Sequence, residues 1–263
     1  MSRGVVVVTG GAGDGIGQGV SRAVAEAGWT ALIGDLDVAA AQRVSADLRA
    51  EGLDAVGAPL DVADERSVDE LFGRKVPSLG GPLRGLVNNA GVGLVKPLGD
   101  VSATEWDELH GIDLRGAFLC ARAAIPLLAS AGGGSIVNIG SVQALGPHVG
   151  YSSYAAAKGG LVGLTRGIAA DYGWEHIRCS IIHPGLVDSP QNREIFASWG
   201  DADQFIKDYV GTRQMIPRLI TPEEIGDLAA FLLSDASRSI TAAEITIDAG
   251  SSRMAFDNRE GRS

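Results

Sequence analysis

The sequence of 263 residues predicts one α/β domain, a doubly wound and mostly parallel seven-stranded sheet with helices on both faces. Short apolar runs without alternation recur along the chain and are rich in β-branched residues, as in strands buried on both faces. Helical patterns separate these runs throughout, which is typical of parallel sheets. No repeat or linker interrupts this order, so we expect residues 1–250 to form a single domain and 251–263 a polar tail.

The composition excludes several function classes. A net charge of −10 argues against nucleic acid or an anionic membrane surface as a partner. Cys120 and Cys179 both lie in apolar sequence, which predicts free, buried thiols with no disulfide and no metal site. The first apolar run is too short for a signal peptide, and Arg122 and Pro126 interrupt the most apolar later stretch. We therefore expect a cytoplasmic protein.

The first strand is expected at residues 5–8, and a glycine-rich turn at 9–17 leads from it into a helix. Strand, turn and helix in this order place backbone N–H groups and a helix N-terminus where a pyrophosphate can bind. The spacing is not the usual Gly-x-Gly-x-x-Gly, so a plain tight turn is the alternative. Because the turn opens an alternating α/β chain, we expect a dinucleotide site with contacts from Gly11, Gly15, Ile16 and Gly17.

An acidic residue ends the second strand, which is expected at 30–34. The carboxylate of Asp35 can accept hydrogen bonds from the adenosine ribose hydroxyls and would repel a 2′-phosphate. Asp14 adds a second negative group near the same place, and neither position offers an Arg or Lys. We expect NAD rather than NADP as the cofactor. The alternative is that Asp35 only caps the helix that begins near Asp37.

The middle of the chain continues the alternation. After a helix at about 37–51, a third strand at 55–59 leads to Asp61 and Val62, and a fourth at 83–87 leads to Asn-Asn-Ala-Gly at 88–91. Small and amide residues at a strand end can approach an adenine or ribose closely, although they could also form only a turn. Residues 102–125 predict one long helix that ends near Pro126. Its apolar residues on more than one face predict burial against the sheet and against another subunit.

A proton-transfer site is predicted between residues 141 and 158. A buried strand within 133–140 ends at Ser141, and an alanine-rich helix follows from Tyr154. Tyr154 and Lys158 stand four residues apart, so a helix places both on one face, where the ammonium favours the phenolate. Tyr154 would then exchange a proton with a substrate oxygen to which Ser141 hydrogen-bonds. Taken alone, this pattern is more often an amphipathic helix with a solvated lysine.

The last part of the chain completes the sheet. A sixth strand at 179–182 leads into His183-Pro184-Gly185, and a last strand is expected at 244–247, after a helix that Pro222 opens. Residues 186–218 hold several aromatic side chains among polar ones and show little regularity. This pattern predicts a mobile lid over the substrate.

In combination, these motifs resemble the short-chain dehydrogenase/reductase family, and the resemblance covers residues 4–250. The matching motifs are Thr9-Gly10 with Gly15-Ile16-Gly17, Asp61-Val62, Asn88-Asn89-Ala90-Gly91, Ser141, Tyr154-x-x-x-Lys158, Pro184-Gly185 and Pro222-Glu223-Glu224-Ile225. The resemblance implies a Rossmann-type fold, a catalytic set of Ser141, Tyr154 and Lys158, and a lysine that also holds the nicotinamide ribose. It implies further cofactor contacts from Asp61, Val62, Asn89, Ala90, Gly91, Pro184, Gly185, Val187 and Ser189. Similar proteins are usually tetramers, so we expect a homotetramer or homodimer, paired through helices 102–125 and 152–172 and the last strand.

The chain departs from the family pattern in three ways. Four residues separate Gly10 from Gly15 where the family has three, so either one residue is inserted or Gly11 takes the second glycine position. Asp113 stands where the family has an asparagine in the long helix, and we expect its carboxylate to act on Lys158 and so on catalysis. Alanines at 242 and 249 replace customary glycines, at little expected cost.

We expect an NAD-dependent enzyme that interconverts a secondary alcohol and a ketone on a small hydroxylated substrate of the polyol, sugar, cyclitol or steroid class. The residues that could face this substrate are Gln143, His148, Tyr151, Leu186 and Trp199. The alternative enzyme is a carbonyl or 3-oxoacyl-thioester reductase, against which the acidic residues near the ribose count. The alternative outside enzymes is a sensor that binds NAD without turnover, since a fold does not determine a function.

Overall fold

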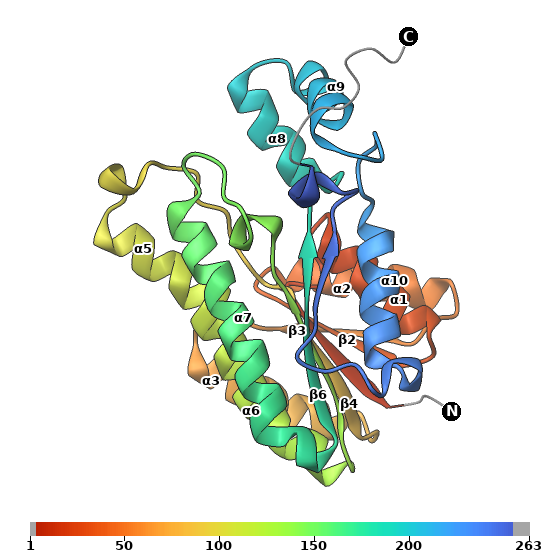
Figure 1. Ribbon diagram of the computed structural model, residues 1–263. Coiled ribbons are helices and arrows are strands. Elements are labelled where there is room, and N and C mark those ends of the chain that lie inside the picture. Colours follow the sequence, from red (N-terminus) through yellow and green to blue (C-terminus); the bar gives the residue numbers. More distant parts are fainter. Residues whose placement is uncertain (1–3, 255–263) are drawn as a thin grey trace.

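The computed structural model describes residues 4–254 and contains a seven-stranded sheet in the order β3-β2-β1-β4-β5-β6-β7 (Figure 1). All neighbouring strands are parallel. The order changes direction between β1 and β4, which makes the sheet doubly wound and Rossmann-like and confirms the predicted fold class. The strands are β1 Val5–Thr9, β2 Thr30–Asp35, β3 Ala55–Pro59, β4 Leu83–Asn88, β5 Gly134–Ile139, β6 Ile177–Pro184 and β7 Glu244–Ile247.

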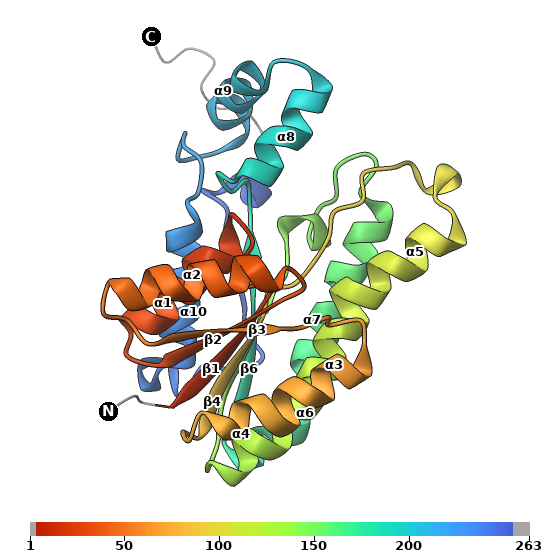
Figure 2. The same cartoon turned by 180° about the vertical axis from the view of Figure 1, so that it is seen from behind.

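Helices cover both faces of the sheet (Figures 1 and 2). One face is covered by α1 (Ile16–Glu26), α2 (Val38–Ala50) and α10 (Pro222–Leu233). The other is covered by α3 (Glu65–Glu70), α4 (Val76–Ser78), α6 (Ala117–Ser130) and α7 (Ser152–Tyr172). Because these helices connect parallel strands, the carboxyl ends of the strands meet at one edge, and the loops that leave them lie together there.

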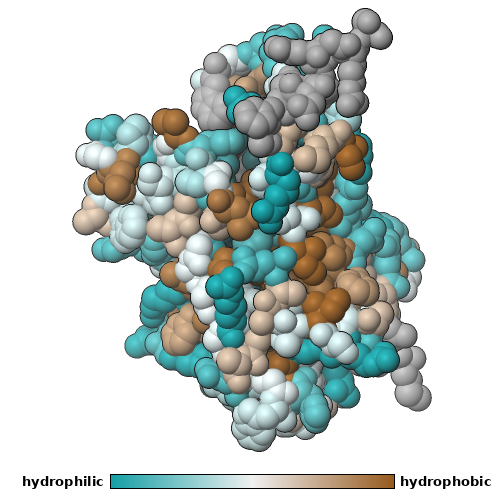
Figure 3. All heavy atoms as spheres, viewed as in Figure 1, coloured by the Kyte–Doolittle hydropathy of each residue, from teal (hydrophilic) through white to brown (hydrophobic). Residues whose placement is uncertain are grey.

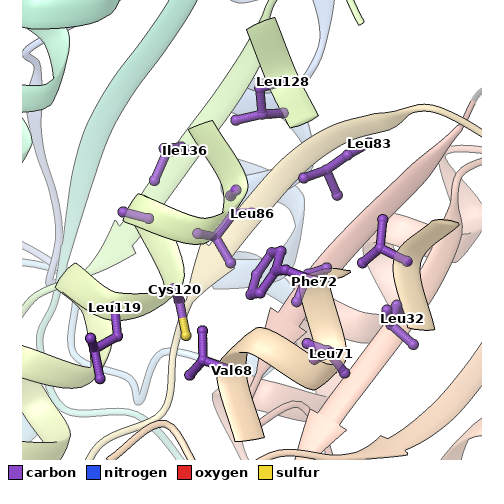
Figure 4. Close-up of a cluster of buried hydrophobic side chains, with 14 of the residues drawn as sticks. Leu32, Val68, Leu71, Phe72, Leu83, Leu86, Leu119, Cys120, Leu128 and Ile136 are labelled. Atoms are coloured by element: carbon purple, nitrogen blue, oxygen red, sulfur yellow. The ribbon is translucent and has the colours of Figure 1, made fainter. Parts of the chain in front are cut away.

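The valines of β1 show how the sheet divides the core. Val5 and Val7 belong to the cluster on the α6 side, while Val6 and Val8 belong to the cluster on the α1 side. All four are at most 1 % exposed, which explains why no polar residue alternates with them in the sequence. Figure 4 shows the cluster on the α6 side, where the ring of Phe72 packs among aliphatic side chains of the strands and helices.

A buried polar network holds the ends of two strands against α7. The Asn88 side chain donates to Asn138 Oδ1 at 2.8 Å, and Asn138 Nδ2 donates to Thr165 Oγ1 at the same distance. Thr165 in turn donates to the carbonyl of Leu161 within α7. Each of these hydrogen bonds is buried, where a polar group without a partner costs about 1–3 kcal/mol. The network therefore fixes α7 relative to β4 and β5, and with it the residues at their ends.

The predicted helix 102–125 differs from expectation in two respects. It begins with α5 (Ala103–His110), passes through a π-helical segment (Gly111–Gly116) and continues as α6. It also runs past Pro126 to Ser130. A proline inside a helix removes one hydrogen bond, but Leu128 in the last turn is fully buried, and its packing holds this turn in helical form.

The segment 186–218 is also more regular than expected, because it contains α8 (Pro190–Trp199) and α9 (Ala202–Arg213). Ser189 and Asp201 cap the two helices through their side chains. Figure 1 shows both helices beyond the carboxyl ends of the strands, on the same edge as the loops that follow β4 and β5. Of the predicted tail 251–263, residues 255–263 lie outside the described part of the chain.

The surface and the cysteines agree with an ordinary α/β core. No helix in the described part of the chain is both long and apolar enough to span a membrane. Cys120 and Cys179 are free and buried, as predicted.

Figure 3 shows apolar residues gathered over β7 and the neighbouring side of α10. Phe231 of α10 is 41 % exposed, and β7 is an edge strand whose side chains are only partly buried.

Candidate active site

A cavity of about 630 Å³ lies at the carboxyl edge of the sheet. Its wall is formed by the glycine-rich turn, the ends of β2, β4, β5 and β6, the start of α7, and the helices α8 and α9. The wall contains most of the site residues that the sequence predicts, which are Asp14, Gly15, Ile16, Gly17, Asp35, Asn89, Ala90, Gly91, Ser141, Gln143, His148, Tyr151, Tyr154, Lys158, Pro184, Gly185, Leu186, Val187 and Ser189.

Some predicted residues do not form this wall. The carboxylate of Asp61 accepts a hydrogen bond from the N–H of Ala63, within the loop after β3. Val62 is buried, and it lies so close to Gly116 that a side chain at 116 would collide with it. The side chain of Trp199 lies outside what the structure describes.

The glycine-rich turn accommodates its extra residue as a bulge. Gly11 packs toward the core, donating its N–H to the carbonyl of Gly34 and accepting from the hydroxyl of Ser21, so it does not contact the cavity. Gly13 and Asp14 are exposed instead. Of the two alternatives for this turn, the structure therefore favours the insertion, and Gly11 is not among the residues that line the described cavity.

The helix α1 begins directly after this bulge. A Cβ on Gly17 would lie 2.1 Å from the carbonyl oxygen of Gly10, so only glycine allows α1 to start so close to β1. The first backbone N–H groups of a helix have no partner within it. At this position they lie beside the cavity wall, where Gly15, Ile16 and Gly17 line it.

Asp35 connects the end of β2 to the glycine-rich turn. Its Oδ2 accepts the N–H of Ala12 at 3.0 Å, and its Oδ1 accepts the N–H of Asp37 at 3.0 Å. The cap of α2 is Asp37, whose side chain accepts the N–H of Ala40. The capping alternative for Asp35 is therefore wrong. Among the described residues that line the cavity, Lys158 is the only Lys or Arg.

Ser141, Tyr154 and Lys158 meet where β5 ends. Ser141 follows β5, and its hydroxyl oxygen accepts the N–H of Gln143 at 3.2 Å, which leaves the hydroxyl hydrogen available to another acceptor. Lys158 lies one turn after Tyr154 in α7, with its ammonium 5.5 Å from the centre of the tyrosine ring. The same ammonium donates to the carbonyl of Ile139 at 3.2 Å, which ties α7 to the strand just before Ser141.

A second charge lies behind Lys158. Asp113, in the π-helical segment, places Oδ2 3.1 Å from the ammonium, and both side chains are at most 5 % exposed. Its other oxygen accepts the N–H of Val92 at 2.7 Å. A Cβ on Gly91 would lie 3.0 Å from this carboxylate and 3.1 Å from the ammonium, so the pair needs a glycine there. Burial alone would lower the pKa of Lys158, but the charges of Tyr154 and Asp113 outweigh burial and raise it.

Aromatic rings line the other half of the cavity. They form a chain of neighbours from α8 to the start of α7, with ring centres 4.6–6.3 Å apart, in the order Phe196, Phe205, Tyr209, His148, Tyr151 and Tyr154. Gln143 holds the loop of this wall by accepting the N–H of His148 at 2.8 Å. Burial and the charge of Arg213 lower the pKa of His148, and burial raises the pKa of Tyr151. Both groups are therefore uncharged near neutral pH.

Comparison with known proteins agrees with this geometry. A family model described as enoyl-(acyl carrier protein) reductase matches residues 11–252. The cis-4-hydroxycyclohexanecarboxylate dehydrogenase of Sinomonas cyclohexanicum is 37% identical over 247 residues, which cover 94% of this chain and 95% of that protein. A crystal structure of a proposed short-chain alcohol dehydrogenase from Sinorhizobium meliloti superposes with a TM-score of 0.87 and 32% identity, covering 95% of this chain and 96% of that one. The chain belongs to the short-chain dehydrogenase/reductase family.

A second relative, the meso-2,3-butanediol dehydrogenase of Serratia marcescens, is 34% identical over 246 residues, covering 94% of this chain and 93% of that protein. With these relatives, this chain is an oxidoreductase of the alcohol and ketone class.

Its alanines at 242 and 249 differ from expectation, because both adopt a φ of 53°. In this left-handed region a Cβ is destabilising by roughly 1–2 kcal/mol, so each of the two alanines lowers stability more than expected.

The sequence does not reveal every residue of this cavity. Val95, Asn192 and Glu194 line it but belong to no motif. Val95 follows β4 after a stretch without regular structure, and the other two lie in α8, where local irregularity predicted no helix. Only the position of these segments at the carboxyl edge of the sheet could have pointed to them.

Proposed function

We propose that this short-chain dehydrogenase/reductase uses NAD to interconvert a secondary alcohol and a ketone on a small hydroxylated substrate. The observation that carries the proposal is the meeting of Ser141, Tyr154 and Lys158 in one cavity whose wall also contains Asp35. The relatives named as dehydrogenases of hydroxylated compounds support the reaction class.

The residues present fit a nicotinamide dinucleotide. The first turn of α1 offers N–H groups to a pyrophosphate, and the glycines of the turn leave room for it. Asp35 can accept hydrogen bonds from ribose hydroxyls, and Lys158 can donate to the second ribose. When bound, the nicotinamide ring supplies the hydride chemistry that amino acid side chains lack.

The chain itself moves the proton. In oxidation, the Tyr154 phenolate accepts the proton of the substrate hydroxyl, while the Ser141 hydroxyl donates a hydrogen bond to the same oxygen. The Lys158 ammonium stabilises the phenolate, and Asp113 keeps this ammonium charged. In reduction the same groups act in reverse, and Tyr154 donates the proton.

NAD rather than NADP follows from the charges at the adenosine end. Asp35 and Asp14 both line the cavity, and a 2′-phosphate would add a further negative charge beside them. Such a phosphate normally pairs with Arg or Lys, and Lys158, the single Lys or Arg of the described wall, lies in α7 beside the catalytic tyrosine.

The substrate wall favours a compact alcohol. Its rings are uncharged, and hydrogen-bonding groups are supplied by Gln143, His148, Tyr151 and Tyr209. One cavity of about 630 Å³ must hold the substrate and part of the cofactor, which favours a small substrate.

We also propose a cytoplasmic homotetramer or homodimer. The edge strand β7, with exposed Phe231 beside it, and the exposed Trp106 and Phe118 on α5 and α6 supply apolar surface for pairing. Sedimentation velocity measures this directly, since a monomer at all concentrations would contradict it.

The decisive experiment measures reduced nicotinamide by its absorbance with a panel of secondary alcohols, for the parent and for Tyr154→Phe. The variant should lose at least about a hundredfold in kcat while its affinity for NAD stays unchanged, because only the proton carrier is removed. Tyr172→Phe is the matched control, since it makes the same change near the other end of α7, outside the described cavity wall.

Three results would contradict the proposal. Near-normal kcat in Tyr154→Phe would remove the tyrosine from the mechanism. NAD binding without turnover of any alcohol or ketone by the parent would favour the sensor, and turnover of oxoacyl thioesters alone would favour the reductase.

A further inference from the structure

A buried histidine lies directly behind the catalytic serine and has no part in the mechanism above. His183, the last residue but one of β6, is completely buried. Its Nδ1 lies 3.0 Å from the carbonyl oxygen of Ser141 and 3.3 Å from the backbone nitrogen of the same residue. The ring therefore contacts both polar groups of the Ser141 backbone through one nitrogen.

The ring is packed tightly in this position. A Cβ on Gly140 would lie 2.7 Å from Nδ1 and 3.0 Å from the adjacent ring carbon, so a side chain at 140 would push the ring away. Glycine at the residue before Ser141 thus allows the imidazole to lie against the end of β5. An amide side chain in the same place would be shorter, and an aliphatic one would offer no polar atom to the serine backbone.

The opposite nitrogen of the ring faces a carboxylate. Nε2 lies 3.6 Å from Oε2 of Glu244 in β7, and it has no hydrogen-bond partner although it is buried. Glu244 is partly exposed, and its other oxygen forms an ion pair with Arg166 of α7. A line of polar contacts thus runs from the surface, through Arg166, Glu244 and His183, to the backbone of Ser141.

We propose that His183 is a positioning residue, which holds the backbone of Ser141 so that its hydroxyl points to the substrate oxygen, and that Glu244 orients the ring. The inference rests on the proposed function, because it assumes that Ser141 takes part in catalysis. It assigns a role to two residues that lie outside the described cavity wall.

The protonation state of the His183 ring determines which backbone group of Ser141 it contacts. A carboxylate opposite Nε2 favours a hydrogen on that nitrogen, and Nδ1 then accepts the N–H of Ser141. Once the ring gains a second proton, Nδ1 becomes a donor and can bond only the Ser141 carbonyl. The charged groups that face the ring are Glu244 from β7 and Lys158 from α7. Burial lowers the pKa of His183, although Ser141 and Glu244 oppose this effect, so the neutral ring prevails near neutral pH.

The first test compares His183→Leu with His183→Asn. Leucine fills the space without a polar atom, whereas the asparagine amide can again contact the Ser141 backbone from the position of Nδ1. We expect kcat to fall about tenfold or more in His183→Leu, with NADH affinity unchanged within twofold, and to recover to within about threefold of the parent in His183→Asn. An unchanged kcat in the leucine variant, or equal losses in both variants, would overturn the proposal.

The second test uses Glu244→Gln, a change at a partly exposed site that decides the question even if the leucine variant fails to fold. The rate of ketone reduction is measured as a function of pH. In this direction Tyr154 donates a proton, so its part in the reaction causes no loss of rate in acid. The parent should lose rate in acid as His183 gains its second proton. Glu244→Gln should move this loss to lower pH, since the carboxylate favours the charged ring, and His183→Asn should lack it. Superimposable profiles for all three would contradict the proposal.

Ser141→Ala separates this inference from the proposed function. If the parent turns over no alcohol or ketone, the proposed function itself fails, and if Ser141→Ala keeps normal turnover, Ser141 has no role in the reaction and the positioning role of His183 falls with it. If Ser141→Ala loses turnover while His183→Leu does not, only the positioning role is wrong.

Discussion

Asp35 offers the sharpest test of the proposed cofactor, because one carboxylate would have two separate roles, one observed and one proposed. It accepts the N–H groups of Ala12 and Asp37, and it stands where ribose hydroxyls would bind. In Asp35→Ala both backbone donors lose their acceptor, which costs roughly 1–3 kcal/mol if they stay unsatisfied. This cost arises in the turn itself, so it lowers kcat/KM for NAD and for NADP alike.

The ratio of the two cofactors isolates the second role. A hydrogen bond from a ribose hydroxyl to a carboxylate contributes about 1.5–3 kcal/mol, so NAD should lose roughly 10- to 100-fold beyond the shared cost. A 2′-phosphate about 4 Å from a carboxylate near the surface is repelled by about 1–4 kcal/mol per unit charge, so NADP gains at least about tenfold. The preference for NAD should therefore fall by about a hundredfold or more.

The assay is steady-state kcat/KM for both cofactors with one saturating alcohol. Asp37→Ala is the matched control, because Asp37 caps α2 and does not line the cavity, so this variant should lower stability without changing the ratio. A ratio within about threefold of the parent value in Asp35→Ala would refute the reasoning and leave Asp35 as a support of the turn alone.

Two further predictions concern charge in the core. Asp113→Asn removes the carboxylate that helps to raise the pKa of Lys158. The cluster formed by Tyr154 and Lys158 should then lose its proton more easily. The pH profile of kcat/KM for alcohol oxidation should therefore shift to lower pH by about one unit. Superimposable profiles at similar rate would show that the carboxylate is only structural. Burial raises the pKa of both Cys120 and Cys179 to about 12, so a disulfide reagent at pH 8 should modify neither in the native protein and both after unfolding in guanidinium. Modification of the native protein within minutes would contradict their burial.

The sheet could be predicted from the sequence because each strand carries its own signal. The β-branched run that begins at Val5 and the apolar run before Ser141 are local, and the order of motifs then determines the topology. The same holds for Tyr154 and Lys158, whose spacing in one helix settles their relation. The roles of these site residues stay predictions until variants are measured.

Contacts between distant segments could not be predicted in this way. The ion pair of Asp113 with Lys158 joins two helices, and the histidine behind Ser141 comes from a strand that follows 35 residues or more later in the chain. The helices α8 and α9 were missed because short polar segments owe their form to caps and to packing on the cavity wall, not to a long apolar period. Local propensity places a helix end at Pro126 because it ignores the buried Leu128 that follows.

The number of residues in the π-helical segment before α6 determines where Asp113 lies relative to Lys158. The buried positions of α5, this segment and α6 include Leu109, Asp113, Ala117, Ala121, Ala124 and Leu128. The first three are four residues apart, so the wide turn absorbs the excess rotation that a regular helix would accumulate. Deleting one residue from 111–116 would rewind the segment and swing α5 and Asp113 by about 100° relative to α6. The placement of an acid opposite Lys158 therefore depends on the number of residues in 111–116 as well as on the residue at position 113.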